Sequence, residues 1–559
     1  MSPIRIKNPI IAGNYPDPSI CRVGDDYYIA CSSFEMYPGI PVFHSRNLAD
    51  WEKIGYALSR ENGFYVSNNA CVSGIMAPTL RYHNGLFYII DANFSDAGNF
   101  IITAENPAGP WSQPHWLTDV PGIDASIFFD HDGKCYVAGT GEVWENGSGE
   151  KERGIWAAEY DIDNFRMAGE PAVIWNSALR GAASPEAPHL YHIGDYYYLV
   201  IAEGGTEHYH SVAVARSREV LGWYEGNPAN PVLTHRQFGL DYPVTNIGHA
   251  DLVQTPDERW YAVMLGSRQI GGRHKNLGRE TFFCPVDWEE GWPLFSKLTG
   301  KVEPEYEIPD FTGGSCQPDA SASGKKTGEK AENVLFGIKT GLSPDCLFWG
   351  SPGEHFYDIA GDGLHLKCLK RSLLHELESE RPGAEKNFDR TIAMLGCWQT
   401  DRCFTLSCVM KFDPENEETA GLALVQAMNH QIRMEVFAAG ENKKVRIVMN
   451  TSSYQVPTYA PGFSYHMHEK ILAEADITGQ ERICLLIKAD GQRISFYVGE
   501  KEEELTCLAA DADCGALAPD YLGNMTGTVL SAFASANGGE SGNEAVFEKI
   551  SVIQGQHCA

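Results

Sequence analysis

The sequence predicts an all-β protein built from a five-bladed β-propeller followed by a β-sandwich. Three observations support this: a turn-and-aromatic block that recurs five times in the first 300 residues, short apolar runs between Gly and Pro turn signals, and strand patterns that resume after a polar stretch. A chain of 559 residues is also too long for one ordinary hydrophobic core, so more than one domain is expected.

The recurring block is a turn bearing Gly or Asp, then aromatic residues, then an apolar strand. The copies are G-D-D-Y-Y-I at 24–29, N-G-L-F-Y-I at 84–89, D-G-K-C-Y-V at 132–137, G-D-Y-Y-Y-L at 194–199 and D-E-R-W-Y-A at 257–262. The second aromatic residues are Tyr28, Tyr88, Tyr136, Tyr198 and Tyr261, at intervals of 60, 48, 62 and 63 residues. A blade of four short strands needs about 40 to 50 residues, so five copies predict five blades with long loops. Ordinary hairpin chemistry is the alternative explanation of the block alone.

Equivalent positions in successive blades form a ring around the propeller axis. The positions 11 or 12 residues before each marker are Asp17, Ala77, Asp124, Glu186 and His249. Four of these five side chains are ionisable, although each begins an apolar strand expected to be innermost. Unpaired buried carboxylates are costly, so three of them around one axis indicate a functional site. Taken singly, each acid is also consistent with a turn, loop or surface position.

Three carboxyl groups suit glycoside hydrolysis. One carboxylic acid protonates the leaving oxygen, and inverting enzymes place a second carboxylate about 6.5–9.5 Å away to admit water. A third, ionised carboxylate raises the pKa of its neighbour and would keep the acid protonated near neutral pH.

The composition of the chain limits the classes of molecule that it is expected to bind. The net charge of −30 disfavours phosphate backbones and anionic membranes, so we expect neither nucleic acid nor membrane partners. The 12 Trp, 25 Tyr and 25 Phe offer faces on which sugar rings stack, although most of these residues are expected to fill the core.

The cysteines and the N-terminal segment indicate the cellular compartment in which the protein acts. The 15 cysteines are odd in number and lack C-x-x-C spacing, which predicts buried thiols rather than a disulfide framework or a zinc site. The opening segment M-S-P-I-R-I-K-N-P-I-I lacks the features of a secretion signal. We therefore expect a cytoplasmic protein that acts on imported oligosaccharides.

Four sequence motifs follow one another along the chain. Three contain ring positions, and the fourth lies C-terminal to the ring positions. They are N-Y-P-D-P-S-I at 14–20, G-I-D-A-S-I at 122–127, E-A-P-H-L-Y at 186–191 and L-G-R-E-T at 277–281. With them the chain resembles the xylosidases and arabinofuranosidases of glycoside hydrolase family 43. The resemblance implies exo-acting, inverting removal of terminal β-D-xylosyl or α-L-arabinofuranosyl residues from xylo- or arabino-oligosaccharides. It also implies the roles: Asp17 as general base, Glu186 as general acid and Asp124 as the residue that tunes and orients the acid.

The same resemblance implies a substrate pocket lined by Phe34, Met76, Ala77, Thr206, His249 and Arg279. Met76 stands where many relatives carry Trp, which bears on the preferred pentose. In similar enzymes the histidine can ligate a calcium ion or water in the central channel; the chemistry itself requires no cofactor. A surface arginine and a satisfied core histidine are the ordinary alternatives for Arg279 and His249.

The domain boundaries follow from composition. We predict the propeller over 1–309, a linker rich in small polar residues over 310–330, and the sandwich over 331–559. Alternation from Phe404 to Phe412, and a hairpin around Asp490-Gly491, support the sandwich. The resemblance implies a lectin-like, concanavalin-like sandwich that closes one side of the pocket. Its segment 523–528 resembles a loop that inserts an aromatic residue in similar enzymes, where this chain offers Met525 or Val529.

Two other functions fit a propeller of this kind. A non-catalytic sugar-binding propeller would reuse the scaffold, but it has no use for three crowded carboxylates. A retaining glycosidase or transglycosidase would place its two carboxyl groups about 5 Å apart. The expected partners are xylo- or arabino-oligosaccharides, with assembly into a homo-oligomer by analogy with cytoplasmic relatives.

Overall fold

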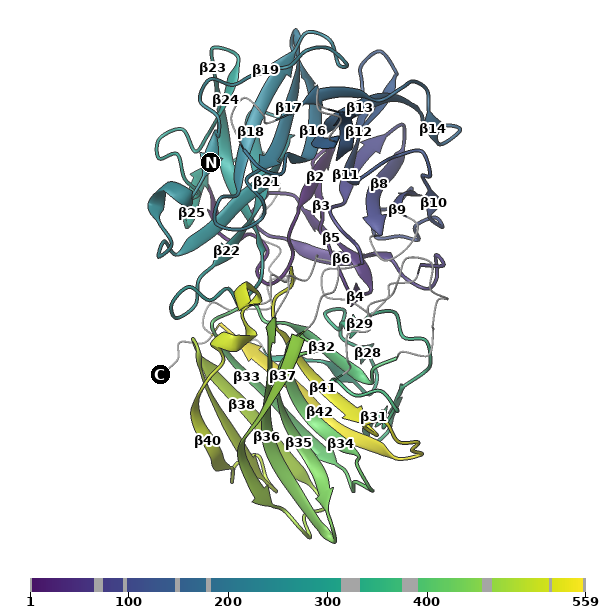
Figure 1. Ribbon diagram of the computed structural model, residues 1–559, viewed down its shortest axis with the longest axis vertical. Coiled ribbons are helices and arrows are strands. Elements are labelled where there is room, and N and C mark those ends of the chain that lie inside the picture. The colour runs from purple at the N-terminus through teal and green to yellow at the C-terminus, as the bar shows by residue number, and fades with distance from the viewer. Residues whose placement is uncertain are drawn as a thin grey trace.

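The computed structural model describes residues 3–64, 74–93, 98–145, 151–176, 182–312, 332–374, 391–454, 465–521 and 525–555. Regular structure in these ranges is β-strand apart from the short 3-10 turns η2 (Arg236–Phe238), η3 (Gly515–Leu517) and η4 (Pro519–Tyr521). Figure 1 shows two bodies packed end to end, the propeller in purple to teal and the sandwich in green to yellow. Within the described ranges, none of the helices has the length and apolar character needed to span a membrane.

Each blade is an antiparallel sheet whose strands follow chain order from its first strand outward. Blade 1 contains β2 (Ser19–Val23), β3 (Asp26–Ala30), β5 (Gly39–Ser45) and β6 (Glu52–Leu58). Blade 2 contains β7 (Thr79–His83), β8 (Leu86–Asn93), β9 (Gly98–Ala104) and β10 (His115–Trp116). Blade 3 contains β11 (Ile123–Phe129), β12 (Cys135–Glu145), β13 (Lys151–Asp161), β14 (Arg166–Met167) and β15 (Ala172–Trp175). Blade 4 contains β16 (Glu186–Ile193), β17 (Tyr196–Glu203), β18 (Ser211–Ser217), β19 (Glu225–Gly226) and β20 (Leu233–Thr234). Blade 5 contains β21 (Val244–Gln254), β22 (Trp260–Arg268), β23 (Glu280–Glu289) and β24 (Trp292–Phe295).

The first strands of the five blades form a closed ring. Strand β2 contacts β7 and β21, strand β11 contacts β7 and β16, and strand β16 contacts β21. The five marker tyrosines all lie on the second strand of a blade, in β3, β8, β12, β17 and β22. The sequence repeat therefore marks the hairpin between the first and second strands, and the predicted five-bladed propeller is confirmed.

The ring is closed by the N-terminal segment. Strand β1 (Ile4–Lys7) pairs antiparallel with β25 (Glu305–Ile308), which follows blade 5. The Asn8 side-chain amide donates to the main-chain oxygens of Phe283 and Glu303, both at 2.8 Å, and its oxygen accepts from Phe283 N at 2.9 Å. The first residues of the propeller are thus fastened to its last strands.

A buried ion pair joins four blades at the axis. The carboxylate of Asp251, which is fully buried on β21, accepts hydrogen bonds from Ser19 Oγ at 2.7 Å, from Arg81 Nη1 at 2.8 Å and from the Tyr191 hydroxyl. These donors belong to blades 1, 2 and 4. Burial alone would raise the pKa of Asp251, but the Arg81 guanidinium holds it well below its usual range, so the carboxylate stays ionised.

The C-terminal body is a sandwich of two antiparallel sheets whose facing side chains form one hydrophobic core. The first sheet has the order β30 (Tyr357–Ala360), β31 (Gly363–Lys367), β42 (Glu544–Gln554), β33 (Cys403–Lys411), β38 (Ile483–Asp490), β39 (Arg493–Gly499) and β40 (Thr506–Asp513), with β26 (Glu332–Val334) beside β42. The second has the order β32 (Met394–Trp398), β41 (Val529–Ser535), β34 (Thr419–Ala427), β35 (His430–Ala439), β36 (Asn442–Tyr454) and β37 (Tyr465–Asp476). A separate small hairpin pairs β27 (Phe336–Gly337) with β28 (Gly341–Leu342). The predicted alternation lies on β33, and the predicted hairpin joins β38 to β39.

The two bodies share an apolar interface. Strand β29 (Phe348–Trp349) of the C-terminal part pairs with β4 (Met36–Tyr37) of the propeller. One hydrophobic cluster contains residues of both bodies, among them Tyr15 and Phe43 of the propeller and Trp398 and Phe533 of the sandwich. The predicted linker, 310–330, falls largely outside the described residues.

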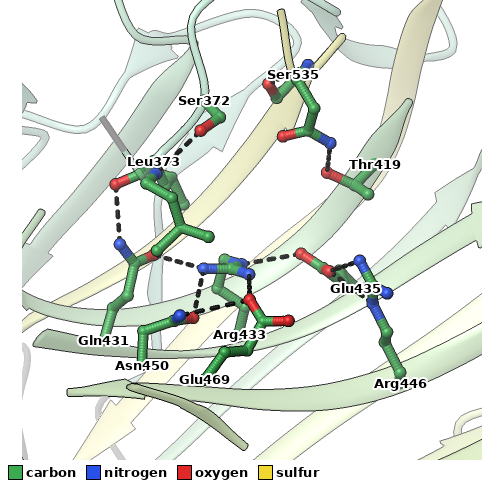
Figure 2. Close-up of polar contacts among 12 residues, drawn as sticks. Ser372, Leu373, Thr419, Gln431, Arg433, Glu435, Arg446, Asn450, Glu469 and Ser535 are labelled. Atoms are coloured by element: carbon green, nitrogen blue, oxygen red, sulfur yellow. Dashed lines mark hydrogen bonds and ion pairs between the residues drawn. The ribbon is translucent and has the colours of Figure 1, made fainter. Parts of the chain in front are cut away.

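Farther along the second sheet, polar side chains replace apolar ones, as Figure 2 shows. The buried Arg433 guanidinium contacts Glu435 at 2.8 Å and Asn450 at 2.9 Å, and Glu435 also binds Arg446. Gln431 donates to the main-chain oxygen of Leu373 at 2.7 Å. Because these charged side chains are paired with one another, this part of the second sheet can bury them without leaving an isolated ion.

The cysteine prediction holds only in part. Eleven cysteines of the described residues carry free thiols, all of them buried except Cys507. Cys403 is disulfide-bonded, so the expectation that no cysteine forms a disulfide is wrong at that position. Odd numbers and scattered spacing do not reveal a pair that only the folded chain brings together.

We predict that Asp251→Asn lowers the free energy of unfolding by about 3–5 kcal/mol, because the Arg81 charge would be left buried without its partner. The measurement is the midpoint of chemical or thermal unfolding. Asp195→Asn is the matched control, since Asp195 is exposed on blade 4. Equal midpoints for the two variants would contradict the assigned role of the axial ion pair.

Candidate active site

The four ionisable ring residues stand where the inner strands bend. Asp17, Asp124 and His249 have φ of 54°, 51° and 53°, and Ala187, next to Glu186, has 52°. β-Bulges interrupt the pairing at the same places in β11, β16 and β21. Left-handed backbone costs non-glycine residues about 1–2 kcal/mol each, and bulges re-aim side chains. Strain repeated at one level of the ring is typical of a functional site.

Asp17 is a buried carboxylate surrounded by donors and cations. Ser32 Oγ donates to its Oδ2 at 2.6 Å, while its Oδ1 lies 3.2 Å from His249 Nδ1 and 3.5 Å from Arg279 Nη1. Burial alone would raise the pKa of Asp17, but Arg279 and His249 together lower it well below its usual range. Asp17 is therefore ionised at neutral pH, as a general base must be.

Arg279 organises one wall of the site. Its Nη1 donates to Thr206 Oγ1 at 2.8 Å, and its guanidinium lies over the Phe34 ring, 5.2 Å from the centroid. Its backbone N–H donates to Asn14 Oδ1 at 3.2 Å. The structure thus brings Arg279, Phe34 and Thr206 together beside Asp17, where the sequence predicted pocket residues.

The sandwich contributes main chain to this wall. Arg279 Nη2 donates to the Met525 carbonyl oxygen at 3.4 Å. A Cβ on Gly278, whose φ is 74°, would lie 2.8 Å from Gly527 N, so glycine is required where the two bodies meet. Val529, the other residue offered for this contact, is instead buried on β41 in the shared hydrophobic cluster. The contact seen at Arg279 is therefore a carbonyl of residue 525.

Glu186 and Asp124 form a coupled acidic pair. Burial raises the pKa of Asp124, and the charge of Glu186 raises it further. Burial also raises the pKa of Glu186, while the Arg153 guanidinium lowers it in part. Arg153 Nη1 donates to Glu186 Oε1 at 2.6 Å. Asp17 and His249 act on both carboxyl groups, so all four ring residues lie within electrostatic reach of one another. The pair holds a proton at a pH where Asp17 does not.

A fourth acid, Asp91, lies beside them. It is fully buried on β8, and its Oδ1 accepts the Ala92 N–H at 2.5 Å. Burial raises the pKa of Asp91 well above its usual value, and the charges of Asp124 and Asp17 act in the same direction. Asp91 is therefore a neutral carboxylic acid, which limits the negative charge of the site.

Met76 and Ala77 lie at the corresponding place in blade 2. Met76 N donates to the Ala92 main-chain oxygen at 3.0 Å, which sets this segment next to β8. Ala77, 6% exposed, precedes β7 by two residues, as Asp17 precedes β2. No charged group therefore enters the ring from blade 2 at this position.

His249 alone does not supply the donor set of a calcium site, so water molecules would have to provide most ligands of a bound calcium ion. Ca²⁺ takes six to eight oxygen ligands, whereas His249 offers one imidazole whose Nδ1 faces Asp17. Among the residues that the structure describes, no three His, Cys, Asp or Glu side chains are grouped to hold a metal ion. His249 acts here as a partner of Asp17.

Comparison with known proteins decides the family. Residues 6–293 match the Glycosyl hydrolases family 43, and residues 347–552 match the Beta xylosidase C-terminal Concanavalin A-like domain. The chain belongs to glycosyl hydrolase family 43. It is a glycosidase, and its two matched segments correspond to the propeller and the sandwich.

Relatives of family 43 align over nearly the whole chain. A xylosidase/arabinosidase of Butyrivibrio fibrisolvens is 38% identical over 96% of this chain and 97% of its own. A non-reducing end alpha-L-arabinofuranosidase of Bacteroides ovatus is 34% identical over 97% of this chain and 93% of its own. Among solved structures, the xylan beta-1,4-xylosidase of Bacillus halodurans C-125 superposes with a TM-score of 0.81 at 26% identity, covering 98% of this chain and 100% of that one.

Three residues of this family 43 site were missed by sequence reasoning: Arg153, Asp91 and Ser32. Asp91 left a signal, because it interrupts the apolar run F-Y-I-I-D-A-N-F. Arg153 left none, since it reaches Glu186 from the third strand of the neighbouring blade.

We predict that Arg153→Leu moves the alkaline limb of the kcat/KM profile to higher pH. The guanidinium favours the ionised form of Glu186, so its loss raises the pKa of Glu186 and preserves the proton of the pair to higher pH. The groups that remain around Glu186 are Asp124, Asp17 and His249. The measurement is kcat/KM on a nitrophenyl pentoside across pH.

Arg166→Leu is the control for this profile, because Arg166 lies on the same blade but pairs with Asp161 at 3.6 Å. The interpretation fails if the Arg153 variant keeps the parent alkaline limb, or if the Arg166 variant moves it equally.

Proposed function

We propose that this glycosidase is an exo-acting, inverting enzyme that removes terminal β-D-xylosyl or α-L-arabinofuranosyl residues from xylo- or arabino-oligosaccharides. The observation that carries the proposal is the opposite protonation of neighbouring acids: Asp17 is kept ionised, while the Asp124–Glu186 pair keeps a proton. Single-displacement hydrolysis requires such a base and such an acid together.

In the proposed mechanism Asp17 accepts a proton from a water molecule, whose oxygen attacks the anomeric carbon. Glu186 donates its proton to the glycosidic oxygen as the bond to the leaving group breaks. Water adds to the opposite face of the sugar, so the anomeric configuration inverts in one step. Asp124 shares the proton of the pair with Glu186, because ionisation of one carboxyl group disfavours ionisation of the other.

Arg279 has two roles in the proposed mechanism. Its guanidinium holds Asp17 ionised, and its contacts with Thr206 and Phe34 fix it in one orientation where a sugar hydroxyl can accept a hydrogen bond. The Met525 carbonyl on its other side brings the sandwich to the wall of the site. A wall supplied by a second body supports removal of terminal units rather than cleavage within a chain.

The names of the relatives support the substrate class. The Butyrivibrio protein is a xylosidase/arabinosidase and the Bacteroides protein is an arabinofuranosidase. The two pentoses place similar hydroxyls in a small pocket, and discrimination between them rests on contacts of about 1–3 kcal/mol. We therefore propose activity on both sugars, with Met76 as the first position to test for preference.

We also propose that the enzyme acts in the cytoplasm on imported oligosaccharides. Assembly into a homo-oligomer and a structural calcium ion near His249 stay predictions from the resemblance; neither enters the mechanism.

The first test is proton NMR of the initial product from nitrophenyl β-xyloside and nitrophenyl α-arabinofuranoside. We expect the product to appear with inverted anomeric configuration. A retained anomer would identify a double-displacement enzyme, and absence of hydrolysis on both substrates would favour a sugar-binding propeller.

A second test separates the two catalytic roles. Glu186→Ala should lower turnover of unactivated oligosaccharides by about 10²–10⁴-fold and spare nitrophenyl glycosides, whose leaving groups need little protonation. Asp17→Asn should impair both substrate types, because every substrate needs the base. Equal losses on both types for Glu186→Ala would exclude it as the general acid.

A further inference from the structure

An ion pair stands beside Arg279, at the end of blade 5 that faces the site. Arg268 is the last residue of β22, and Glu280 is the first residue of the neighbouring strand β23. Arg268 Nε donates to Glu280 Oε2 at 2.6 Å and its Nη2 donates to Glu280 Oε1 at 2.7 Å, so the contact is bidentate. The Glu280 side chain is fully buried, and that of Arg268 is 30% exposed. The proposed mechanism uses neither residue, although the pair adjoins a wall of the site.

The start of β23 holds the segment that leads to the proposed base. Residues 279–281 each bind one residue of 13–15, and Asp17 follows that segment by two residues. The bonds are Arg279 N to Asn14 Oδ1 at 3.2 Å, Gly13 N to Glu280 Oε1 at 2.9 Å, and Thr281 Oγ1 to the Tyr15 carbonyl oxygen at 2.6 Å. The backbone position of Asp17 therefore depends on the start of β23.

The same pair reaches the sandwich. Arg268 Nη2 also donates to the Thr400 carbonyl oxygen at 2.9 Å. Thr400 lies between β32 and β33, and its N–H donates to Gln554 Oε1 of β42 at 2.7 Å. A Cβ on Gly13, whose φ is 93°, would lie 3.0 Å from Thr400 Cγ2. Thr400 thus contacts both the ion pair and the segment that the pair holds.

Arg268 fixes the orientation of the Glu280 carboxylate. Burial raises the pKa of Glu280, and the Arg268 guanidinium offsets part of that rise. A carboxylate held at both oxygens by one guanidinium has a single orientation. Without Arg268, the carboxyl group can rotate about its terminal bonds, and the Gly13 N–H loses a fixed acceptor.

We propose that Arg268 and Glu280 are positioning residues for hydrolysis. The pair fastens residues 13–15 to the start of β23 and to the sandwich, and so sets the separation of Asp17 from Arg279, whose Oδ1 and Nη1 atoms lie 3.5 Å apart. The inference rests on the proposed function for the role of Asp17 as the base. The pair acts through Gly13 and the main chain that follows it.

The experiment measures kcat and KM of full-length Arg268→Met, Glu280→Gln and the double variant on nitrophenyl xyloside and nitrophenyl arabinofuranoside. We expect each single variant to lose about 10- to 100-fold in kcat, because a misplaced base slows every turnover. KM should change less than kcat, since Arg279 keeps its contacts with Thr206 and Phe34. The double variant should be no slower than the slower single variant, because residues that act as a unit have non-additive effects.

Arg433→Met is the matched control, because Arg433 and Glu435 form another buried pair, in contact at 2.8 Å in the sandwich (Figure 2). Both Arg→Met variants should lower the midpoint of unfolding, but the Arg433 variant should keep parental kcat. Arg268→Lys retains a positive charge beside Glu280 without the bidentate fork, so it should recover only part of the lost kcat.

Parental kcat in folded Arg268→Met and Glu280→Gln proteins would overturn the proposal. An equal loss of kcat in the Arg433 variant would also overturn it, because general destabilisation would then explain the effect. If Arg268→Met does not fold, Arg268→Lys and Glu280→Gln provide the same comparison.

The parent enzyme separates this proposal from the proposed function. A parent that hydrolyses neither pentoside would reject the proposed function. An active parent whose kcat is unchanged by the substitutions at Arg268 and Glu280 would reject the positioning role alone.

Discussion

Asp251 accepts hydrogen bonds from Ser19, Arg81 and Tyr191, and so ties four blades at the axis. The catalytic candidates are close neighbours of these residues in the chain. Asp17 precedes Ser19 by two residues, and His249 precedes Asp251 by two. The positions of the reacting groups therefore depend on a buried ion pair whose partners must all be present, because a lone buried charge is strongly destabilising.

Acids in one small site behave differently because their neighbours differ. Asp17 faces Arg279, His249 and the Ser32 hydroxyl, all of which stabilise negative charge. Asp124 and Glu186 face each other, and Asp91 is buried near both Asp17 and Asp124. Arg153 and, to a smaller extent, His249 offset the accumulation of negative charge at Glu186. The ionisation state of each acid thus depends on the cations that the blades place beside it. The acidic side chains themselves are nearly alike.

The fold could be predicted because its repeat is local. Turn chemistry marks one hairpin in every blade, and counting back from Tyr28 or Tyr198 reaches the inner-strand bends. Partners that reach across blades have no fixed spacing, which explains why Arg153 and Arg81 escaped notice. The Met525 contact was anticipated as a side chain, but the backbone carbonyl makes it. The disulfide of Cys403 depends likewise on tertiary proximity.

The pairing of β1 with β25 has a consequence for biosynthesis. Residues 4–7 leave the ribosome long before their partner strand, 305–308. The β1 segment must stay unpaired until some 300 further residues have been translated. Its alternation I-R-I-K, with a cation at every second position, suits that interval, because charged side chains oppose premature strand association.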